Sequence, residues 1–298
     1  MCGIVGLLIK NPALRPRLGE LMTPILDEMA ARGPESAGLA VFTDQLSGGQ
    51  RKYSIHAPVW GYEWSGFEAR FIERFGIEAQ LAVKGNHAVL VCDEAPEAVK
   101  SWTREHFGQL HVLSAGRAID IYKDVGHPSD IALRYDFRKL SGTHVVGHTR
   151  MATESAVTPD RAHPFTAGED FCLVHNGTIS NPFMIRRKLE HRGIVFETDN
   201  DTEAATRFLE WRMREGDSLE DALRQGFREL DGFYTFLIGT DTELALVRDA
   251  FACKPAIVAE TDDYVAIASE FRGLAHLPGV NDAHLFEPMP EEIYVWKV

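Results

Sequence analysis

The chain has 298 residues, of which 45% are hydrophobic, and it carries a formal net charge of −13. This length suffices for one large domain, or two smaller ones, with a substantial core. The acidic balance argues against a general nucleic-acid binder, which needs a basic surface to displace counterions. No apolar run approaches the roughly 18 residues of a membrane-spanning helix, and the start does not resemble a signal peptide. We therefore expect a cytoplasmic protein that binds neither membrane nor nucleic acid.

Four cysteines lie far apart in the sequence without a CxxC pair, so neither a zinc site nor a disulfide framework is indicated. Cys92 and Cys172 lie in apolar, strand-like runs and are expected to be structural thiols. Cys2, in the opening MCGIVG, leaves two interpretations open. It is either a small apolar residue that begins a buried strand, or a nucleophile exposed by removal of Met1.

The first part of the chain predicts a helix followed by a strand. Apolar residues recur at helical spacing over 18–29, and GLAVF at 38–42 is typical of a buried strand. The pattern changes over about 43–140. This stretch predicts two strands around a Lys-Gly-Asn turn, a helix beginning near Pro96, a second strand pair over 109–124 and a short helix over 128–137. We interpret 43–140 as a compact α+β insertion in one domain that spans 1–298.

The remaining sequence predicts strands in THVVGHTR and DFCLVHNG, each followed by a turn. Helices are expected from Asn181 to Gly193, over 201–215, and from Ser218, where Asp221 resembles the second residue of a capping box. Two hairpins follow, over 232–249 and 254–270. Because strands and helices are grouped rather than alternating, the pattern favours α+β layers over a parallel doubly wound sheet.

The chemistry available to Cys2 depends on its α-amino group. A thiol attacks a carbonyl carbon as the thiolate and therefore needs a nearby base. If Met1 is removed, the free α-amine of Cys2 is a base that titrates near neutral pH and acts directly or through one water. One residue would then provide both the nucleophile and its proton acceptor.

Five further motifs follow MCGIVG: RGPESAG at 32–38, GHTRMAT at 147–153, HPF at 163–165, VHNGTI at 174–179 and TDNDTE at 198–203. Together and in this order they resemble the class II glutamine amidotransferases, whose glutaminase domain is an N-terminal-nucleophile hydrolase. The resemblance covers 1–42 and about 141–275. It implies an α+β fold, a four-layer αββα sandwich, interrupted by the α+β insertion at 43–140.

The resemblance also implies a glutamine site. Arg150 matches the family's arginine for the substrate α-carboxylate, which a planar guanidinium binds through two hydrogen bonds. Asp201 matches the aspartate for the α-ammonium group, although Asp199 lies two residues away and leaves open which carboxylate points inward. Thr153 and His163 are expected to line the same site.

Asn176 and Gly177 match the family's pair of oxyanion donors, which stabilise the tetrahedral intermediate. An isolated Asn-Gly pair is more typical of a hairpin turn, but the preceding strand and the order of the motifs favour the catalytic role. Arg32 and Gly33, in the loop near the nucleophile, are expected to position it rather than to take part in the chemistry.

Three histidines, His148, His163 and His175, raise the alternative of a metal site. Their spacing does not match an HExxH-type pair, and the resemblance implies neither a metal nor another cofactor. We therefore expect these side chains to be structural or to lie at the rim of the substrate site.

The resemblance thus implies a glutaminase, in which Cys2 forms a thioester with the γ-glutamyl group and ammonia is released. The pattern is most similar to the free-standing amidotransferase subunit of glutamate-synthase-like complexes, including N-methylglutamate synthase. L-Glutamine is the implied substrate, and separate synthase subunits are the implied receivers of the ammonia. Two alternatives remain open: a stand-alone γ-glutamyl amidase of the same fold, and a non-catalytic regulatory subunit.

Overall fold

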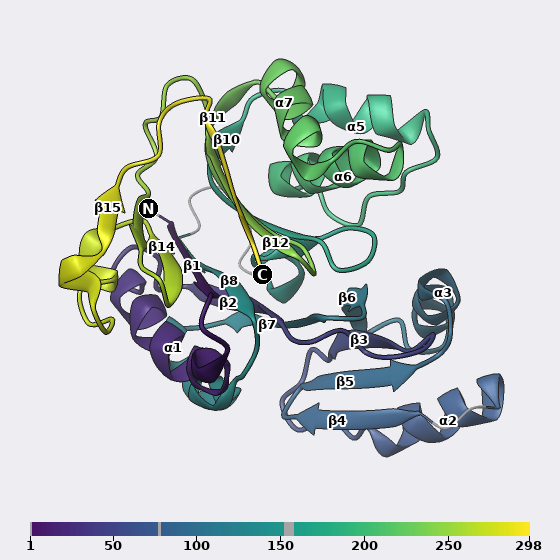
Figure 1. The fold of residues 1–298 in the computed structure, drawn as a ribbon. Helices are drawn as coiled ribbons and strands as arrows, with labels where there is room; N and C mark the ends of the chain where they lie inside the picture. The colour runs from purple at the N-terminus through teal and green to yellow at the C-terminus, as the bar shows by residue number, and fades with distance from the viewer. Residues whose placement is uncertain (1, 77–78, 152–157) are drawn as a thin grey trace.

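The computed structural model describes residues 2–76, 79–151 and 158–298. The strands form three sheets of seven, five and four strands (Figure 1). The seven-stranded sheet has the order β15-β13-β14-β1-β8-β2-β7 and contains β1 (Gly3–Ile9), β2 (Ser36–Phe42), β7 (Ile119–Val125), β8 (His144–Arg150), β13 (Ile257–Glu260), β14 (Tyr264–Ala268) and β15 (His284–Phe286). The five-stranded sheet has the order β16-β12-β11-β10-β9 and contains β9 (Phe165–Thr166), β10 (Cys172–Ile179), β11 (Gly232–Gly239), β12 (Glu243–Arg248) and β16 (Ile293–Lys297). The four-stranded sheet has the order β4-β5-β3-β6 and contains β3 (Arg51–His56), β4 (Gln80–Lys84), β5 (His87–Cys92) and β6 (His111–Gly116).

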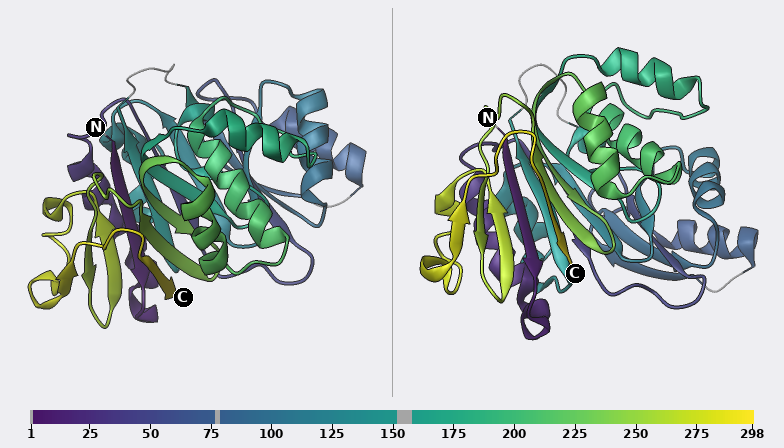
Figure 2. Two further views of the ribbon diagram at one scale, coloured as in Figure 1. Left: turned by 90° about the horizontal axis from the view of Figure 1, so that it is seen from above. Right: turned by 45° about the horizontal axis from the view of Figure 1, so that its top comes forward.

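The two larger sheets pack face to face around a shared apolar core. Ile4 and Leu8 of β1 and Val146 of β8 enter this core from one sheet, and Val174 of β10 and Leu237 of β11 enter it from the other. Helix α1 covers the outer face of the seven-stranded sheet, while α5, α6 and α7 cover the outer face of the five-stranded sheet (Figure 2). The predicted four-layer αββα sandwich is confirmed.

Local sequence explains where the helices form. The α-helices are α1 (Leu18–Met29), α2 (Ser65–Phe75), α3 (Pro96–His106), α4 (Pro128–Arg134), α5 (Pro182–Glu190), α6 (Asp201–Arg214) and α7 (Leu219–Glu229). The short 3₁₀ helices are η1 (Pro12–Arg17), η2 (Phe137–Lys139), η3 (Pro159–Arg161), η4 (Phe271–Gly273) and η5 (Val280–Asp282). Helix α7 begins at the predicted cap, where Ser218 Oγ accepts a 3.1 Å hydrogen bond from the Asp221 backbone N–H. In α1, every apolar position of the predicted periodic pattern is buried.

The segment 43–140 divides between two sheets. Its part from β3 to β6, with α2 and α3, builds the four-stranded sheet and a separate core around Tyr53, Phe67 and Trp102. This unit lies beside the sandwich, at the lower right of Figure 1. Strand β7 instead pairs with β2 at the edge of the seven-stranded sheet, and α4 packs near α1.

The prediction that the two strands over 109–124 pair with each other is wrong. Both strands exist, but β6 pairs with β3 and β7 pairs with β2, so they belong to different sheets. The reason is a long-range contact that local sequence does not show. The Asp170 carboxylate accepts hydrogen bonds of 2.7, 2.8 and 2.9 Å from the backbone N–H groups of Arg117, Ala118 and Ile119. These hydrogen bonds hold the connection between β6 and β7 as it passes from the four-stranded to the seven-stranded sheet, where a tight hairpin was expected.

The later elements match the sequence pattern. Strands β11 and β12 form one predicted hairpin, and β13 and β14 form the other. Within the described residues, no helix combines the length and the apolar character needed to cross a membrane.

Candidate active site

Cys2 lies at the entrance of β1, a fully buried strand in the middle of the seven-stranded sheet. Side chains alternate between the two faces of β1, and Ile4 and Leu8 lie in the core between the sheets. Cys2 is two residues before Ile4 and therefore lies on the same face. At Gly3, an added Cβ would lie 2.8 Å from Thr149 Oγ1 and 2.9 Å from Met29 Cβ. The close packing at Gly3 therefore fixes the strand one residue after the thiol, while Cys2 itself stays partly exposed.

Two side chains from distant parts of the chain hold the carbonyl oxygen of Cys2. Arg32 Nε donates to it at 2.8 Å, and Asn176 Nδ2 donates to it at 3.2 Å. The Arg32 guanidinium is anchored in turn by Glu270, with 2.6 Å between Nη1 and Oε1. The thiol Sγ lies 3.9 Å from the backbone oxygen of Met151, a weak contact. The backbone of Cys2 is therefore fixed by charged and amide donors while its sulfur is only loosely held.

Asn176 and Gly177 lie inside β10 and pair with Thr235 and Tyr234 of β11, so the hairpin-turn interpretation of this Asn-Gly pair does not apply. Asn176 shares the parity of Val174 and faces the core between the sheets, toward Cys2. Its amide has two N–H donors, and one is used by the Cys2 carbonyl. Gly177 has a φ of 142°, and an added Cβ would lie 2.0 Å from the Phe233 oxygen. This position requires glycine.

Arg150 ends β8 and is 7% exposed. It shares the parity of Val146, whose side chain lies in the core between the sheets. Arg150 Nη1 donates to the backbone oxygen of Arg161 at 3.1 Å. Gly33 packs against the same strand end, where an added Cβ would lie 2.5 Å from the Arg150 nitrogen. Thr153, predicted to contact the substrate, lies outside the described residues.

The two candidate aspartates point in different directions. Asp201 begins α6, and its Oδ2 accepts a 2.9 Å hydrogen bond from the Ile179 N–H of β10. The Asp199 side chain is 69% exposed and forms an ion pair with Arg161 at 2.9 Å. Asp201 is therefore docked on the strand that carries Asn176, whereas Asp199 faces solvent.

The three histidines form one buried cluster. The His148 and His163 rings stack with centroids 4.1 Å apart. His163 Nε2 and His175 Nδ1 lie 3.0 and 3.1 Å from Thr202 Oγ1. Burial lowers the pKa of all three, for His148 to about 3, so each ring is neutral near pH 7. In the part of the chain that the structure describes, no group of three or more His, Cys, Asp or Glu side chains is placed to hold a metal ion.

Sequence reasoning missed three polar residues that support the site. Glu270 anchors Arg32, Ser269 Oγ accepts a 3.0 Å hydrogen bond from the Ile4 N–H, and Thr202 joins two of the histidines. The available signal was the polar pair Ser269-Glu270 directly after the buried strand β14. That signal is weak because Ser269 and Glu270 reach the site only through the pairing of β14 with β1, which the sequence does not reveal.

Burial distinguishes two of the other thiols from Cys2. Cys92 and Cys172 are buried, and burial raises the pKa of Cys92 to about 11 and that of Cys172 further. Both remain protonated at neutral pH, as expected of structural thiols. Cys253 is exposed.

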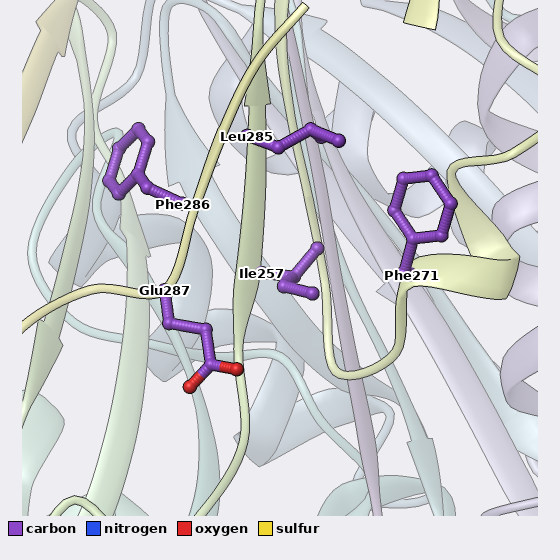
Figure 3. A pocket seen from close by; sticks show the side chains of 5 residues that line it. All are labelled: Ile257, Phe271, Leu285, Phe286 and Glu287. Carbon is purple, nitrogen blue, oxygen red and sulfur yellow. The ribbon is translucent and has the colours of Figure 1, made fainter. Parts of the chain in front are cut away.

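Two cavities lie away from Cys2. One, of about 310 Å³, is lined by Ile257, Phe271, Leu285, Phe286 and Glu287 beside the edge strand β15 (Figure 3). The other, of about 420 Å³, lies where the four-stranded sheet meets β7 and is lined by Pro58, Trp60, Asn86, Asp124 and Arg134. Neither is lined by Cys2, Asn176 or Arg150, so the candidate site is defined by its contacts and not by these cavities.

Comparison with known proteins identifies the family of the chain. Residues 148–276 match the family model described as "Glutamine amidotransferase domain". The "Glutamine amidotransferase-like protein GlxB" of Rhizobium meliloti is 45% identical over 297 residues, covering 99% of this chain and 98% of that protein. A "Putative glutamine amidotransferase" of Methanothermobacter thermautotrophicus is 31% identical over 313 residues, covering 99% of both chains. The chain therefore belongs to the glutamine amidotransferase family.

Solved structures support the fold. The glutamine phosphoribosylpyrophosphate amidotransferase of B. subtilis, complexed with ADP and GMP, superposes with a TM-score of 0.61 at 21% identity. A structure described as the allosteric regulatory enzyme of purine biosynthesis gives a TM-score of 0.63 at 20% identity. Each match covers 99% of this chain but only 47% and 46% of those chains, so this chain spans about half their length. At these identities the likeness establishes the shared fold alone.

Proposed function

We propose that this protein hydrolyses L-glutamine to glutamate and ammonia with Cys2 as the nucleophile, after removal of Met1. The observation that carries the proposal is the 3.2 Å hydrogen bond between Asn176 Nδ2 and the Cys2 carbonyl. It joins the strand entrance that bears a thiol to an amide donor on the opposite sheet. A thiol beside an amide donor is the minimum arrangement for acyl transfer through a tetrahedral intermediate.

The proposed reaction uses Cys2 twice. Its α-amine takes the thiol proton, and the sulfur attacks the side-chain amide carbon of glutamine, forming a C–S bond. Asn176 and the backbone N–H of Gly177 donate to the oxyanion. The C–N bond then breaks as the ammonium group of Cys2 gives its proton to the leaving nitrogen, which departs as ammonia. Water hydrolyses the thioester and releases glutamate.

Arg150 and Asp201 are proposed to bind the amino-acid end of the substrate. Arg150 is a planar cation on the inner face of β8, suited to the α-carboxylate. Asp201 is fixed by the Ile179 N–H, whereas Asp199 is exposed and paired with Arg161. This difference favours Asp201 as the partner of the α-ammonium group. Arg32 and Gly33 position the strand ends that carry Cys2 and Arg150, while His163 and Thr153 are proposed to line the substrate site.

We further propose that the ammonia passes to a separate synthase subunit, of glutamate synthase or N-methylglutamate synthase type. What supports this is the partial match to larger glutamine-dependent enzymes. The glutamine–fructose-6-phosphate aminotransferase of Methanothermobacter thermautotrophicus matches over 196 residues, 65% of this chain but 32% of that protein. Glutamine turnover that no candidate synthase chain changes, on a protein that co-purifies with none, would contradict this part of the proposal.

The experiment for the glutaminase compares Cys2→Ala with Cys253→Ala, a matched removal of an exposed thiol. Intact-mass measurement first establishes whether Met1 is absent from the purified protein. Glutamate release from L-glutamine should fall to background in Cys2→Ala and stay at the wild-type rate in Cys253→Ala. Glutaminase activity that survives Cys2→Ala would refute the mechanism. A panel of γ-glutamyl amides separates glutamine hydrolysis from a broader γ-glutamyl amidase, because Arg150 and Asp201 contact only the shared amino-acid end.

A further inference from the structure

Lys123, on β7 in the 43–140 segment, is a buried lysine that the proposed mechanism does not use. It is 4% exposed, and it forms no ion pair with a carboxylate of the described residues. Its Nζ donates instead to the backbone oxygens of Ala162 at 2.8 Å, Pro164 at 3.2 Å and Asp160 at 3.5 Å. A buried ammonium normally has a carboxylate partner. At Lys123 three backbone carbonyl oxygens of one loop take the place of that partner, so the lysine ties the loop to β7.

The loop at 160–164 also packs tightly on the sheet beneath it. Gly38 of β2 is paired with Lys123, and an added Cβ at Gly38 would lie 2.3 Å from the His163 oxygen and 2.5 Å from Lys123 Cβ. The Lys123 ammonium also lies 5.1 Å from the centroid of the Phe165 ring. The absence of a side chain at Gly38 allows the loop to approach β2 closely. The hydrogen bonds from Lys123 fix the position of the loop along β2 and β7.

The same loop contacts Arg150 and the residue next to Asp201, and Arg150 and Asp201 are the two proposed binding groups for glutamine. The Arg161 oxygen accepts the 3.1 Å hydrogen bond from Arg150 Nη1. His163 Nε2 lies 3.0 Å from the hydroxyl of Thr202, the residue after Asp201 at the start of α6. The loop therefore bridges the end of β8, which bears Arg150, and the start of α6, which bears Asp201.

We infer that Lys123 is a positioning residue that sets the spacing between Arg150 and Asp201, and so the affinity for the amino-acid end of the substrate. This inference rests on the proposed glutaminase function. The Cys2 backbone is held separately, by Arg32 and Asn176. Loss of the lysine amine therefore loosens substrate binding while the nucleophile and the oxyanion donors keep their places.

The test is Lys123→Met, which keeps the length of the apolar stem and removes the amine. The matched control is Lys52→Met, at a lysine that is 6% exposed and bonds to Asp120 and Thr43, each at 2.9 Å. Lys123→Met should raise KM for L-glutamine about tenfold, the size expected for one lost charged hydrogen bond, with kcat changed less than about threefold. Lys52→Met should lower Tm without raising KM. If Lys123→Met does not fold, Lys123→Gln, which keeps N–H donors, should give a KM above that of the wild type.

The outcomes separate the two proposals. A Lys123 variant with the KM of the wild type, in a protein whose glutaminase depends on Cys2, overturns the inference alone. A variant whose kcat falls while KM is unchanged overturns it as well, because that result assigns Lys123 to the nucleophile. Wild-type protein that does not hydrolyse glutamine overturns the proposed function, and the inference with it.

Discussion

Replacing Arg32 with methionine tests whether Cys2, the proposed nucleophile, is held by its backbone. The substitution removes the 2.8 Å bond from Arg32 Nε to the Cys2 carbonyl and the 2.6 Å bond to Glu270. A buried hydrogen bond from a charged donor contributes about 1.5–3 kcal/mol. The Glu270 pair adds at most about 1 kcal/mol, because that carboxylate is partly exposed and keeps Arg272 at 2.9 Å. The expected loss of about 1.5–4 kcal/mol is smaller than the stability of an ordinary domain, so the variant should fold.

The decisive assay is glutaminase kinetics beside thermal unfolding. A displacement of the reacting atom by about 1 Å can lower the rate about 10²-fold, so kcat of Arg32→Met should fall by about that factor. KM should change little, since Arg150 and Asp201 are untouched. Arg51→Met is the control, because Arg51, at the start of β3 in the four-stranded sheet, forms a partly exposed pair with Glu169. A kcat for Arg32→Met equal to that of Arg51→Met would refute the positioning role.

Three further predictions concern other parts of the site. Gly177→Ala should lower kcat by about 10²-fold or more, because the methyl group would meet the Phe233 oxygen; Gly226→Ala in α7, whose nearest contact is 3.4 Å away, should leave kcat unchanged. Asp201→Asn should raise KM for glutamine about tenfold, and Asp199→Asn should leave it within about threefold; equal effects would contradict the choice of Asp201. Burial by itself raises the pKa of Glu203, but hydrogen bonds from the Glu197 N–H and from Arg207 outweigh burial and lower it. The stability that Glu203 contributes is therefore present above the carboxyl's unfolded pKa and lost as pH falls through its folded pKa. Glu203→Gln should flatten the acid side of a plot of unfolding free energy against pH, and an unchanged slope would contradict this assignment.

Local patterns were sufficient for most elements. The periodic apolar residues of α1, the capping pair of α7 and the two late hairpins each depend on residues close in sequence. The layered fold followed from the motifs, whose order resembles a known family. The alternation of side chains along each strand also places Cys2 and Asn176 on the faces that meet in the core between the sheets, as the proposed site requires.

Long-range contacts could not be predicted from these local patterns. The crossing from β6 to β7 is held by Asp170, more than fifty residues further along the chain. Glu270 anchors Arg32 across 238 residues, and Lys123 meets its carbonyl partners about forty residues away. Asp170, Glu270 and Lys123 lie outside the six sequence motifs. Each is a polar group satisfied only after the sheets have packed, which is why its sequence neighbours gave no signal.

The packing of the sheets and the geometry of the site depend on the same strand. β8 presents His144 and His148 to the opposite sheet, where His144 Nε2 lies 2.8 Å from the Thr240 oxygen and His148 Nε2 lies 3.1 Å from the His175 oxygen. Burial lowers the pKa of both rings to about 3, so each is neutral at ordinary pH and must carry its hydrogen on Nε2 to donate to a carbonyl. His175 directly precedes Asn176. The bond from His148 therefore fixes β10 against β8 one residue before Asn176, the proposed oxyanion donor. The distance from Asn176 to Cys2 is set by these contacts between the sheets, since the two residues lie on different sheets.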